Sequence, residues 1–538
     1  MISAYTGTQI REAEKPLLDS GMGAVLMQRA AYGLASAVIT ELRSRGRRLY
    51  GSSVVVLTGK GNNGGDGLFA AARLAGRGMR TTAVLAADSA HPEGLAAFER
   101  AGGRVLRLTE ANAGELAAHA GRADVVIDAL LGTGARGGLR GTAADLVSAL
   151  SLGPPSLGGR SPGPRSLGLR GLVVACDVPS GVNADTGEAE QPVLPADLTV
   201  TFGGTKAGLL TDPGADFAGA VQVVPIGIED HLPWPALRRF EAADLAALLP
   251  APERRSHKYS RGVLGIIAGS PAYPGAAVLA CRGALAAGVG MVRYIGPPDV
   301  ADLIRQSCPE VVCSTGAVAD THVQAWLVGS GMDGADREQM QRVRDAAESG
   351  LPTVADAGAL PVLPDVLAPQ VVLTPHAGEL ATLLKRLGAG MERDAVEAST
   401  LAAVRQAAGL TEATVLLKGA TTLVASPYQD FYSQSEGTPW LATAGSGDVL
   451  AGVIGALLAQ VGSDVGRFRA AGIDPDERWA AIAAMAASLH ARAGMAAADG
   501  APLTAGRIAD ALPQIWGKVS MLSKQRAGNR NSQSHPLR

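Results

Sequence analysis

Residues 59–67, GKGNNGGDG, place two amides and a carboxylate in a glycine-rich turn directly after the apolar stretch 54–58. A nucleotide phosphate loop carries its lysine after the last glycine, whereas Lys60 precedes the glycines here, so that assignment fails. The GxGxxG pattern at 59–64 is a weak dinucleotide signal, and Asp66 would repel a bare pyrophosphate. This turn alone supports two interpretations equally. It could bind a polyol, an amide or a hard cation, or it could be a tight turn capped by its own side chains.

Two further turns carry a carboxylate where a predicted strand ends. Asp128 opens the segment DALLGTGARGG (128–138), and Asp177 opens DVPSG (177–181). The carboxyl ends of parallel strands meet at one edge of a sheet, where ligands of such sheets bind. Free backbone amides at 132–138 would suit a phosphate group. One residue from each of the three turns could supply an oxygen to a cation: Asn63, Asp128 and Ser180.

The second half of the chain has its own residues suited to chemistry. AGSGD (444–448) precedes the apolar run 449–461, and glycines at the start of a helix leave amides free to bind an anion. Asp448 could act there as a base on a hydroxyl while the amides stabilise a transferring phosphoryl group. An aspartate at a helix start is also a common N-cap, and both roles can hold together.

Two more turns of the second half fit the same chemistry. LLKGATT (416–422) places Lys418 and two threonine hydroxyls after a predicted strand, where they suit nucleotide phosphates. TPHAGE (374–379) places His376 and Glu379 three residues apart. A lone histidine is more often structural than catalytic, but its position in a loop beyond a strand favours a role in the site.

Apolar strands that alternate with helical segments must position all these turns. Continuous apolar strands predict parallel sheets with helices on both faces. We therefore predict an α/β protein of two domains, the first with a Rossmann-like sheet. The expected parts are a first domain at 1–229, a linker at 230–250, a second domain at 251–519 and a disordered tail at 520–538. The Gly-, Pro- and Ser-rich segment 151–171 is predicted to be a flexible insertion.

Composition argues against several functional classes. The 538 residues carry a net charge of −2 and only 4% aromatic residues, so we expect neither nucleic acid nor a membrane as a partner. The four cysteines lack metal or redox spacing and are expected to be buried thiols in a reducing compartment. The N-terminus lacks a signal peptide's apolar core, and the run 449–461 is too short to span a bilayer. We expect a cytoplasmic protein.

The turns of the first half resemble the motifs of the NAD(P)H-hydrate epimerase family, also called the YjeF N-terminal domain. The resemblance rests on GKGNNGGDG, DALLGTG and DVPSG and spans most of residues 1–229. It implies that the hydrated nicotinamide nucleotide is bound by Asn62, Asn63, Gly64, Gly65, Asp66, Gly132, Thr133, Gly134, Ala135, Arg136, Gly137, Gly138 and Asp177. It also implies a potassium ion held by Asn63, Asp128 and Ser180.

Epimerisation at C6 of the hydrate needs proton transfer at a masked iminium or enamine carbon, and a carboxylate suits that task. We favour Asp177 as the acid/base. Lys206, in GGTKAG (203–208), is a second candidate, and a solvated surface lysine is an equally supported alternative for it.

The turns of the second half resemble the ribokinase-like superfamily, and within it the NAD(P)H-hydrate dehydratase branch. GSPAYPGAAVLACRGALAAGVG (269–290) and LVGSGM (327–332) add to this resemblance, which covers about 255–515. It implies a ribokinase-like second domain that uses magnesium, organised by Glu379, and ADP. The hydrate would contact Ala276, Gly331, His376 and the base Asp448. The adenine nucleotide would be held by Lys418, Gly419, Ala420, Thr421, Thr422 and Gly447.

The two resemblances together imply a bifunctional repair enzyme, an isomerase joined to a lyase. One domain would epimerise the R and S hydrates of NADH and NADPH, called NADHX and NADPHX. The other would phosphorylate the C6 hydroxyl of the S form with ADP, after which the ring nitrogen expels phosphate and AMP remains. The alternative is a ribokinase-like small-molecule kinase with a nucleotide-sensing N-terminal domain. We also expect a homo-oligomer.

Overall fold

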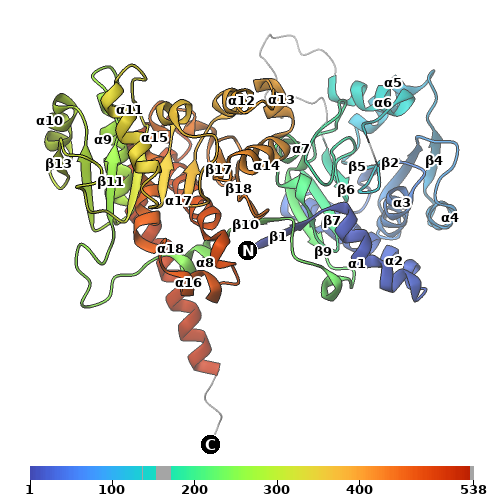
Figure 1. Cartoon of the computed structure of the whole chain (residues 1–538). Coiled ribbons are helices and arrows are strands. Elements are labelled where there is room, and N and C mark those ends of the chain that lie inside the picture. Colours follow the sequence, from blue (N-terminus) through green and yellow to red (C-terminus); the bar gives the residue numbers. More distant parts are fainter. Residues whose placement is uncertain (136, 153–170, 534–538) are drawn as a thin grey trace, which may run out of the picture. The chain divides into compact units, whose positions relative to one another are not determined.

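The computed structural model describes residues 1–135, 137–152 and 171–533, and the chain divides into two compact units (Figure 1). The N-terminal unit is Ser3–Ala236, and the C-terminal unit is Met1–Ile2 with Leu237–Arg538. The segment predicted as a linker at 230–250 therefore divides at Ala236. Its second part forms the strand β10 (Leu237–Arg239) and the helix α8 (Ala242–Leu248) of the C-terminal unit.

A seven-stranded parallel sheet of order β4-β3-β2-β5-β6-β7-β9 forms the centre of the N-terminal unit. The order reverses direction between β2 and β5, and ligands of such sheets bind at this switch point. The strands are β2 (Ser53–Thr58), β3 (Arg80–Leu85), β4 (Arg104–Arg107), β5 (Val125–Ala129), β6 (Leu172–Cys176), β7 (Leu198–Phe202) and β9 (Ala220–Val224). A short parallel pair, β1 (Ile2–Tyr5) and β8 (Thr205–Lys206), lies outside this sheet.

Helices cover both faces of this sheet, as predicted, because successive strand residues point to opposite sides. Val54 and Val56 pack with α2 and α3, whereas Val55 and Leu57 pack with α5 and α6. The helices are α1 (Gly7–Asp19), α2 (Gly23–Ser44), α3 (Asn62–Ala75), α4 (Pro92–Arg100), α5 (Ala113–Gly121), α6 (Gly141–Leu152) and α7 (Gly214–Ala218). Most of the predicted insertion at 151–171 lies outside the described residues.

The sheet of the C-terminal unit runs in the order β13-β12-β11-β14-β15-β16-β17-β18-β19-β10. Strands from β13 to β17 are parallel, and β17, β18 and β19 are antiparallel. The strands are β11 (Val263–Ile267), β12 (Met291–Ile295), β13 (Val312–Ser314), β14 (Ala325–Val328), β15 (Thr353–Ala355), β16 (Val371–Leu373), β17 (Thr414–Leu417), β18 (Thr422–Ala425) and β19 (Phe431–Gln434). The pattern of apolar runs did not predict the β18–β19 hairpin.

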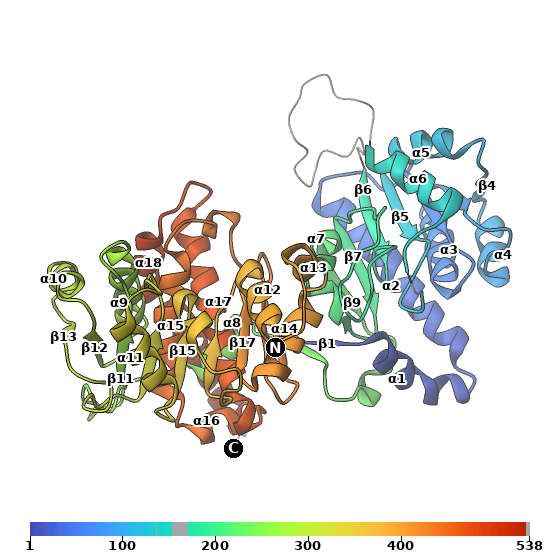
Figure 2. The same cartoon turned by 45° about the horizontal axis from the view of Figure 1, so that its top comes forward.

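One core of the C-terminal unit is formed by α9, α15 and α17 against the sheet, while α11 and α14 contact the strands outside this core (Figure 2). The helices are α9 (Pro274–Ala286), α10 (Pro298–Ser307), α11 (Arg337–Ala347), α12 (Ala377–Arg386), α13 (Arg393–Ala398), α14 (Thr400–Thr411), α15 (Ser446–Val461), α16 (Val465–Ala470), α17 (Arg478–Ala498) and α18 (Ala505–Gln533). None of the helices in the described ranges is long and apolar enough to cross a membrane.

Helices α9 and α15 touch along their backbones. A Cβ atom on Gly452 of α15 would lie 2.2 Å from the carbonyl oxygen of Ala280 in α9. A Cβ atom on Gly283 of α9 would lie 2.5 Å from the carbonyl oxygen of Val449. Glycine is therefore required at both crossing points, because any side chain would push the two helices apart.

The tail differs from the sequence prediction of disorder at 520–538. Helix α18 continues to Gln533, and residues 534–538 lie outside the described part of the chain. The segment that follows Ser520 contains Met, Leu, Lys, Gln, Arg and Ala, which are good helix formers, and its first proline is Pro536. A helix that has already formed against the core can therefore extend into this segment, because propagation costs less than nucleation.

Candidate active sites of the two units

The turn at 59–67 connects β2 to α3, with Gly61 at the helix N-cap and Asn62 as the first helical residue. Its glycines permit very close packing. A Cβ atom on Gly64 would lie 2.1 Å from the carbonyl oxygen of Gly59, and one on Gly59 would lie 2.0 Å from that of Leu130. The turn after β2 is thereby held against the turn after β5, so the first two predicted segments adjoin.

Asn63, Asp128 and Ser180 also come together, around the backbone of Leu131. The Ser180 hydroxyl donates to Oδ1 of Asp128 over 2.6 Å, and the Ser180 N–H donates to Oδ2 over 2.8 Å. The Asn63 amide donates to the carbonyl of Leu131 over 2.8 Å, and the Leu131 N–H donates to the Ser180 hydroxyl over 2.9 Å. Asp128 is fully buried, and this burial raises the pKa of its carboxyl group despite the hydrogen bonds from Ser180.

Asp177 lies in the left-handed region, with φ of 71°, directly after β6. Its Oδ1 contacts the Lys206 ammonium at 2.6 Å and accepts from the Thr201 hydroxyl at 3.1 Å. Its Oδ2 accepts from the backbone N–H of Thr133 at 3.1 Å and from the Thr133 hydroxyl. Burial alone would raise the pKa of Asp177, but Lys206 and Thr133 outweigh it and lower this pKa.

Lys206 is 1% exposed and also donates to the carbonyl of Phe202 over 2.8 Å. The alternative that Lys206 is a solvated surface lysine is therefore wrong. A buried ammonium needs an anionic partner, and Asp177 is that partner.

Asp66 lies in α3 near the carboxyl ends of the strands, and only 9% of its surface is exposed. Its Oδ1 is buried and has no hydrogen-bond partner within the described ranges. Burial raises the pKa of Asp66 well above its ordinary value, and the charges of Asp177 and Glu14 raise it further, while Lys206 opposes them. Asp66 and Asp177 therefore sit in one cluster but have pKa values shifted in opposite directions.

The turn predicted to bind phosphate contacts a carboxylate of the protein itself. The Gly138 N–H donates to the carboxylate of Glu190 over 2.8 Å. Glu190 lines a cavity of about 60 Å³ together with three residues of this turn, Gly132, Ala135 and Gly137. A phosphate at Gly138 would have to displace Glu190. Arg136, the remaining predicted contact in this turn, lies outside the described residues.

In the C-terminal unit, Asp448 lies in the first turn of α15, the helix that Gly445 caps. Burial raises the pKa of Asp448 to about 6, with a further contribution from Asp356, while a hydrogen bond from Ser330 and the charge of Lys418 lower it. A carboxylate with such a pKa is ionised at neutral pH and is basic enough to accept a proton from a hydroxyl.

Lys418 joins the two other predicted turns of this unit. Its ammonium lies 2.8 Å from Oδ1 of Asp356 and 3.8 Å from Oε2 of Glu379. Its backbone N–H donates to the carbonyl of Pro375 over 2.9 Å, and Oε2 of Glu379 accepts from the His376 N–H over 2.9 Å. Burial would lower the pKa of Lys418, but Asp356 and Glu379 outweigh it and raise this pKa.

The remaining predicted residues of the C-terminal unit adjoin these groups. A Cβ atom on Gly331 would lie 2.4 Å from that of Ala276, and one on Gly447 would lie 3.6 Å from the Lys418 ammonium. Gly419, Ala420, Thr421 and Thr422 follow Lys418 at the connection from β17 to β18. His376 lines a cavity of about 290 Å³ with Leu360, Thr382 and Arg386, among others.

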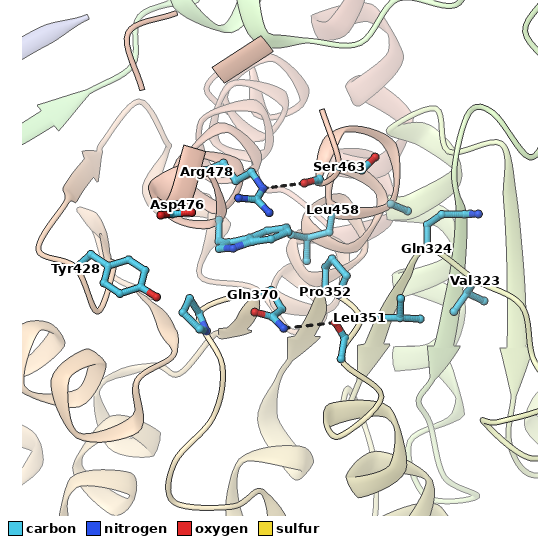
Figure 3. A pocket seen from close by; sticks show the side chains of 15 residues that line it. Val323, Gln324, Leu351, Pro352, Gln370, Tyr428, Leu458, Ser463, Asp476 and Arg478 are labelled. Atoms are coloured by element: carbon cyan, nitrogen blue, oxygen red, sulfur yellow. Dashed lines mark hydrogen bonds between the residues drawn. The ribbon is translucent and has the colours of Figure 1, made fainter. Parts of the chain in front are cut away.

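A larger cavity of about 570 Å³ lies elsewhere in the C-terminal unit (Figure 3). Gln324, Pro352 and Gln370, which line it, precede β14, β15 and β16, so this cavity lies at the amino ends of these strands. The site residues predicted from the sequence follow the carboxyl ends instead. Figure 3 shows the Arg478 guanidinium reaching toward the segment at Ser463, and its Nε donates to the carbonyl of Gly462 over 2.8 Å. None of the site residues predicted from the sequence lines the larger cavity.

Asp356, Ser330 and Glu14 also belong to these clusters, although none of them is among the site residues that the sequence motifs predict. Asp356 directly follows β15, so the rule that identified Asp128 and Asp177 could have found it. Ser330 follows β14 in the segment LVGSGM, which was singled out for Gly331 alone. Glu14 lies on α1, far from any motif in the sequence, and no local signal could have placed it beside Asp66.

Both halves of the chain match known families. Residues 23–208 match the model described as YjeF-related protein N-terminus, and residues 264–514 match that of NAD(P)H-hydrate dehydratase. The ADP/ATP-dependent NAD(P)H-hydrate dehydratase from Bacillus subtilis, a solved structure, shares 26% identity with a TM-score of 0.45. The match covers 52% of this chain and 97% of that structure.

Relatives that match both halves are named as single bifunctional enzymes. The bifunctional NAD(P)H-hydrate repair enzyme Nnr of Mycobacterium tuberculosis is 41% identical over 463 residues, which cover 85% of this chain and 89% of the relative. The protein of the same name from Corynebacterium glutamicum is 32% identical over 601 aligned positions, covering 97% and 99%. With its two α/β units and a carboxylate-centred site in each, the chain belongs to the family of bifunctional NAD(P)H-hydrate repair enzymes.

Proposed function

We propose that this chain epimerises the R and S hydrates of NADH and NADPH in its N-terminal unit and dehydrates the S form in its C-terminal unit. The observation that carries the proposal is a separate carboxylate–lysine cluster in each unit: the buried pair Asp177 and Lys206 in one, and the partly buried Asp448 beside Lys418 in the other. The relatives that match both halves of the chain support it. Both epimers arise from one damaged cofactor, so one chain with both activities repairs all of it.

In the N-terminal unit, the hydrate would lie over the turns at 62–66 and 132–138, with its C6 centre facing Asp177. Lys206 keeps Asp177 ionised, which provides a fixed negative charge beside a carbon that becomes cationic during epimerisation. The acid/base role expected for Asp177 would require this weakly basic carboxylate to take up a proton. Full epimerisation by Asp177→Asn would contradict both roles, because this substitution removes the charge and the proton acceptor together.

The oxygens around Leu131 fit a potassium ion. Asp128 is a buried carboxylate without a cationic side chain as partner in the described part of the chain, and a buried charge of this kind needs compensation. Oxygens of Asn63, Ser180 and Asp128 would bind the ion, which would supply positive charge near the substrate. We expect epimerisation to be faster with potassium than with sodium at equal ionic strength.

In the C-terminal unit, ADP would lie against Lys418, the turn 419–422 and the amide of Gly447, with Asp448 facing the C6 hydroxyl of the S hydrate. Asp448 would take the hydroxyl proton as the terminal phosphoryl group moves to C6 oxygen, giving AMP. The ring nitrogen then expels phosphate. Magnesium, for which Glu379 supplies a carboxylate near Lys418, would neutralise charge on the phosphates.

One experiment tests both activities. The protein is incubated with mixed NADHX epimers, ADP, magnesium and potassium, and the return of NADH absorbance is followed. Complete recovery supports both activities. If only the S fraction is recovered quickly and the rest returns at the spontaneous rate of epimerisation, the proposed epimerase activity is contradicted. Phosphorylation of another alcohol without recovery of NADH would favour a small-molecule kinase. Cytoplasmic location and a homo-oligomer stay predictions, the latter to be measured by light scattering.

A further inference from the structure

Both carboxylate oxygens of Asp177 already accept hydrogen bonds from donors of the protein itself. Each of its two oxygens accepts from two donors: Lys206 and Thr201 at Oδ1, and the N–H and hydroxyl of Thr133 at Oδ2. A carboxylate offers about four acceptor positions, so this one is saturated. A proton arriving at Asp177 would have to displace one of these donors and would leave the Lys206 ammonium buried without an anion.

Asp66 belongs to the same cluster, but its carboxyl group is not saturated with hydrogen-bond donors. Its Oδ1 is buried and lacks a hydrogen-bond partner among the described residues. A buried carboxylate without donors is costly, whereas a carboxylic acid at this place carries no charge and keeps a proton available. The helix α3 places Asp66 at the switch point of the sheet, within electrostatic reach of Asp177.

We propose that Asp66 is a catalytic residue of the epimerase site, whose carboxyl group gives a proton to the C6 hydroxyl of the hydrate and later takes one back. Asp177 stays ionised and stabilises the cationic intermediate. The proposal rests on the proposed epimerase function and names the group that carries the proton in it.

The chemical step balances without any further reactant. The Asp66 proton passes to the C6 hydroxyl oxygen, the C6–O bond breaks with its electron pair on the departing water, and the ring nitrogen lone pair forms a C6=N bond. Water then adds to the opposite face of C6, the C=N electron pair returns to nitrogen, and the excess proton returns to the Asp66 carboxylate. The product is the other epimer.

Several charged or titratable groups surround Asp66. Asp177 and Cys176 lie at the end of β6, Glu14 on α1 and Lys206 on β8. His91, at the N-cap of α4, packs against Gly65. Because the protonated form of Asp66 starts the reaction, the epimerisation rate should fall as pH rises through the pKa of Asp66. Glu14 also has a pKa raised mainly by burial, so it is the group most easily confused with Asp66 in a pH profile.

The test follows conversion of the isolated R epimer of NADHX by the full-length protein without ADP, so that dehydration cannot occur. The spontaneous rate is subtracted at each pH. We expect Asp66→Asn to lower kcat for epimerisation about 100-fold, as for loss of a general acid, while hydrate affinity stays near that of the unmodified protein. Asp66→Glu should restore part of the rate, and Glu14→Gln should keep the fall of the rate at high pH.

Asp216→Asn is the matched control. Its carboxyl group also has a pKa raised by burial, but the charge acting on it is that of Asp212 rather than that of Asp177, and we expect unchanged epimerisation. Thermal unfolding checks that each variant is folded. Normal epimerisation by Asp66→Asn, or an unchanged fall of its rate at high pH, would overturn the Asp66 assignment alone. An unmodified protein no faster than the spontaneous reaction would overturn the proposed function itself.

Discussion

Asp177 is buried directly after β6, and Asp448 is partly buried in the first turn of α15, yet their surroundings drive their pKa values in opposite directions. Lys206 contacts Asp177 directly and lowers the pKa of that residue. In the other unit, the lysine is paired with Asp356 instead, and the pKa of Asp448 rises to about 6. Asp177 is the more deeply buried of the two and yet has the lowered pKa. The choice of partner for one lysine therefore decides whether a carboxylate serves as a fixed charge or as a proton acceptor.

The largest effect should follow from removing the proton acceptor of the C-terminal unit. We expect Asp448→Asn to lower dehydration of the S hydrate about 1,000-fold, because no other carboxylate at the start of α15 can take the hydroxyl proton. The measurement is the rate of NADH formation from purified S hydrate with ADP and magnesium. Epimerisation by the same variant serves as the control and should be normal. Dehydration at more than a tenth of the usual rate would contradict the role of Asp448 as the proton acceptor.

Breaking the Asp177–Lys206 pair should mainly affect stability. Lys206→Met leaves a buried carboxylate without its cation, and we expect it to lower the free energy of unfolding by about 3 kcal/mol. Asp177→Asn added to Lys206→Met should restore part of this loss, because no unpaired charge remains. Denaturant unfolding measures both. Equal stability of Lys206→Met and the unmodified protein would show that Asp177 does not depend on this lysine.

The pH dependence should differ between the two units. Dehydration needs ionised Asp448, so its rate should fall about tenfold per pH unit once pH drops below about 6. Asp177 has a lowered pKa and should stay ionised throughout that range. Rates of both reactions measured from pH 5 to 8 with one preparation make the comparison. A low-pH fall shared by both reactions would show that one common event, such as unfolding, is responsible.

The smallest effect is expected from Ser330→Ala. Its hydrogen bond lowers the pKa of Asp448, so its loss should raise that pKa and move the low-pH fall of dehydration to higher pH. The shift in midpoint is the measured quantity, and Thr382→Ala, in the neighbouring cavity, is the control that should leave the midpoint in place.

Local sequence predicts the ends of strands well but not the partners that meet there. Asp128 and Asp177 could be placed in one site because each follows an apolar strand, and strand ends converge in a parallel sheet. The burial of Lys206 could not be predicted, since it depends on pairing with a residue 29 positions earlier (206 − 177) that the motif itself does not specify. The hydrogen bond from the Gly138 N–H to Glu190 could not be predicted either, because it joins residues 52 positions apart. At the C-terminus, the polar composition of residues 520–538 predicts disorder, whereas α18 continues to Gln533 because many residues of this segment are good helix formers.

The glycine contact between α9 and α15 has a consequence for how this protein can change. Asp448 lies on α15, and Gly452 and Gly283 pack α15 directly against the backbone of α9. The axis of α15 therefore cannot shift without disrupting the packing of the core. Substitutions that loosen this interior should therefore reduce turnover before they reduce the amount of folded protein. Selection for repair activity would then act on residues deep inside the unit, far from any substrate, and would keep them small.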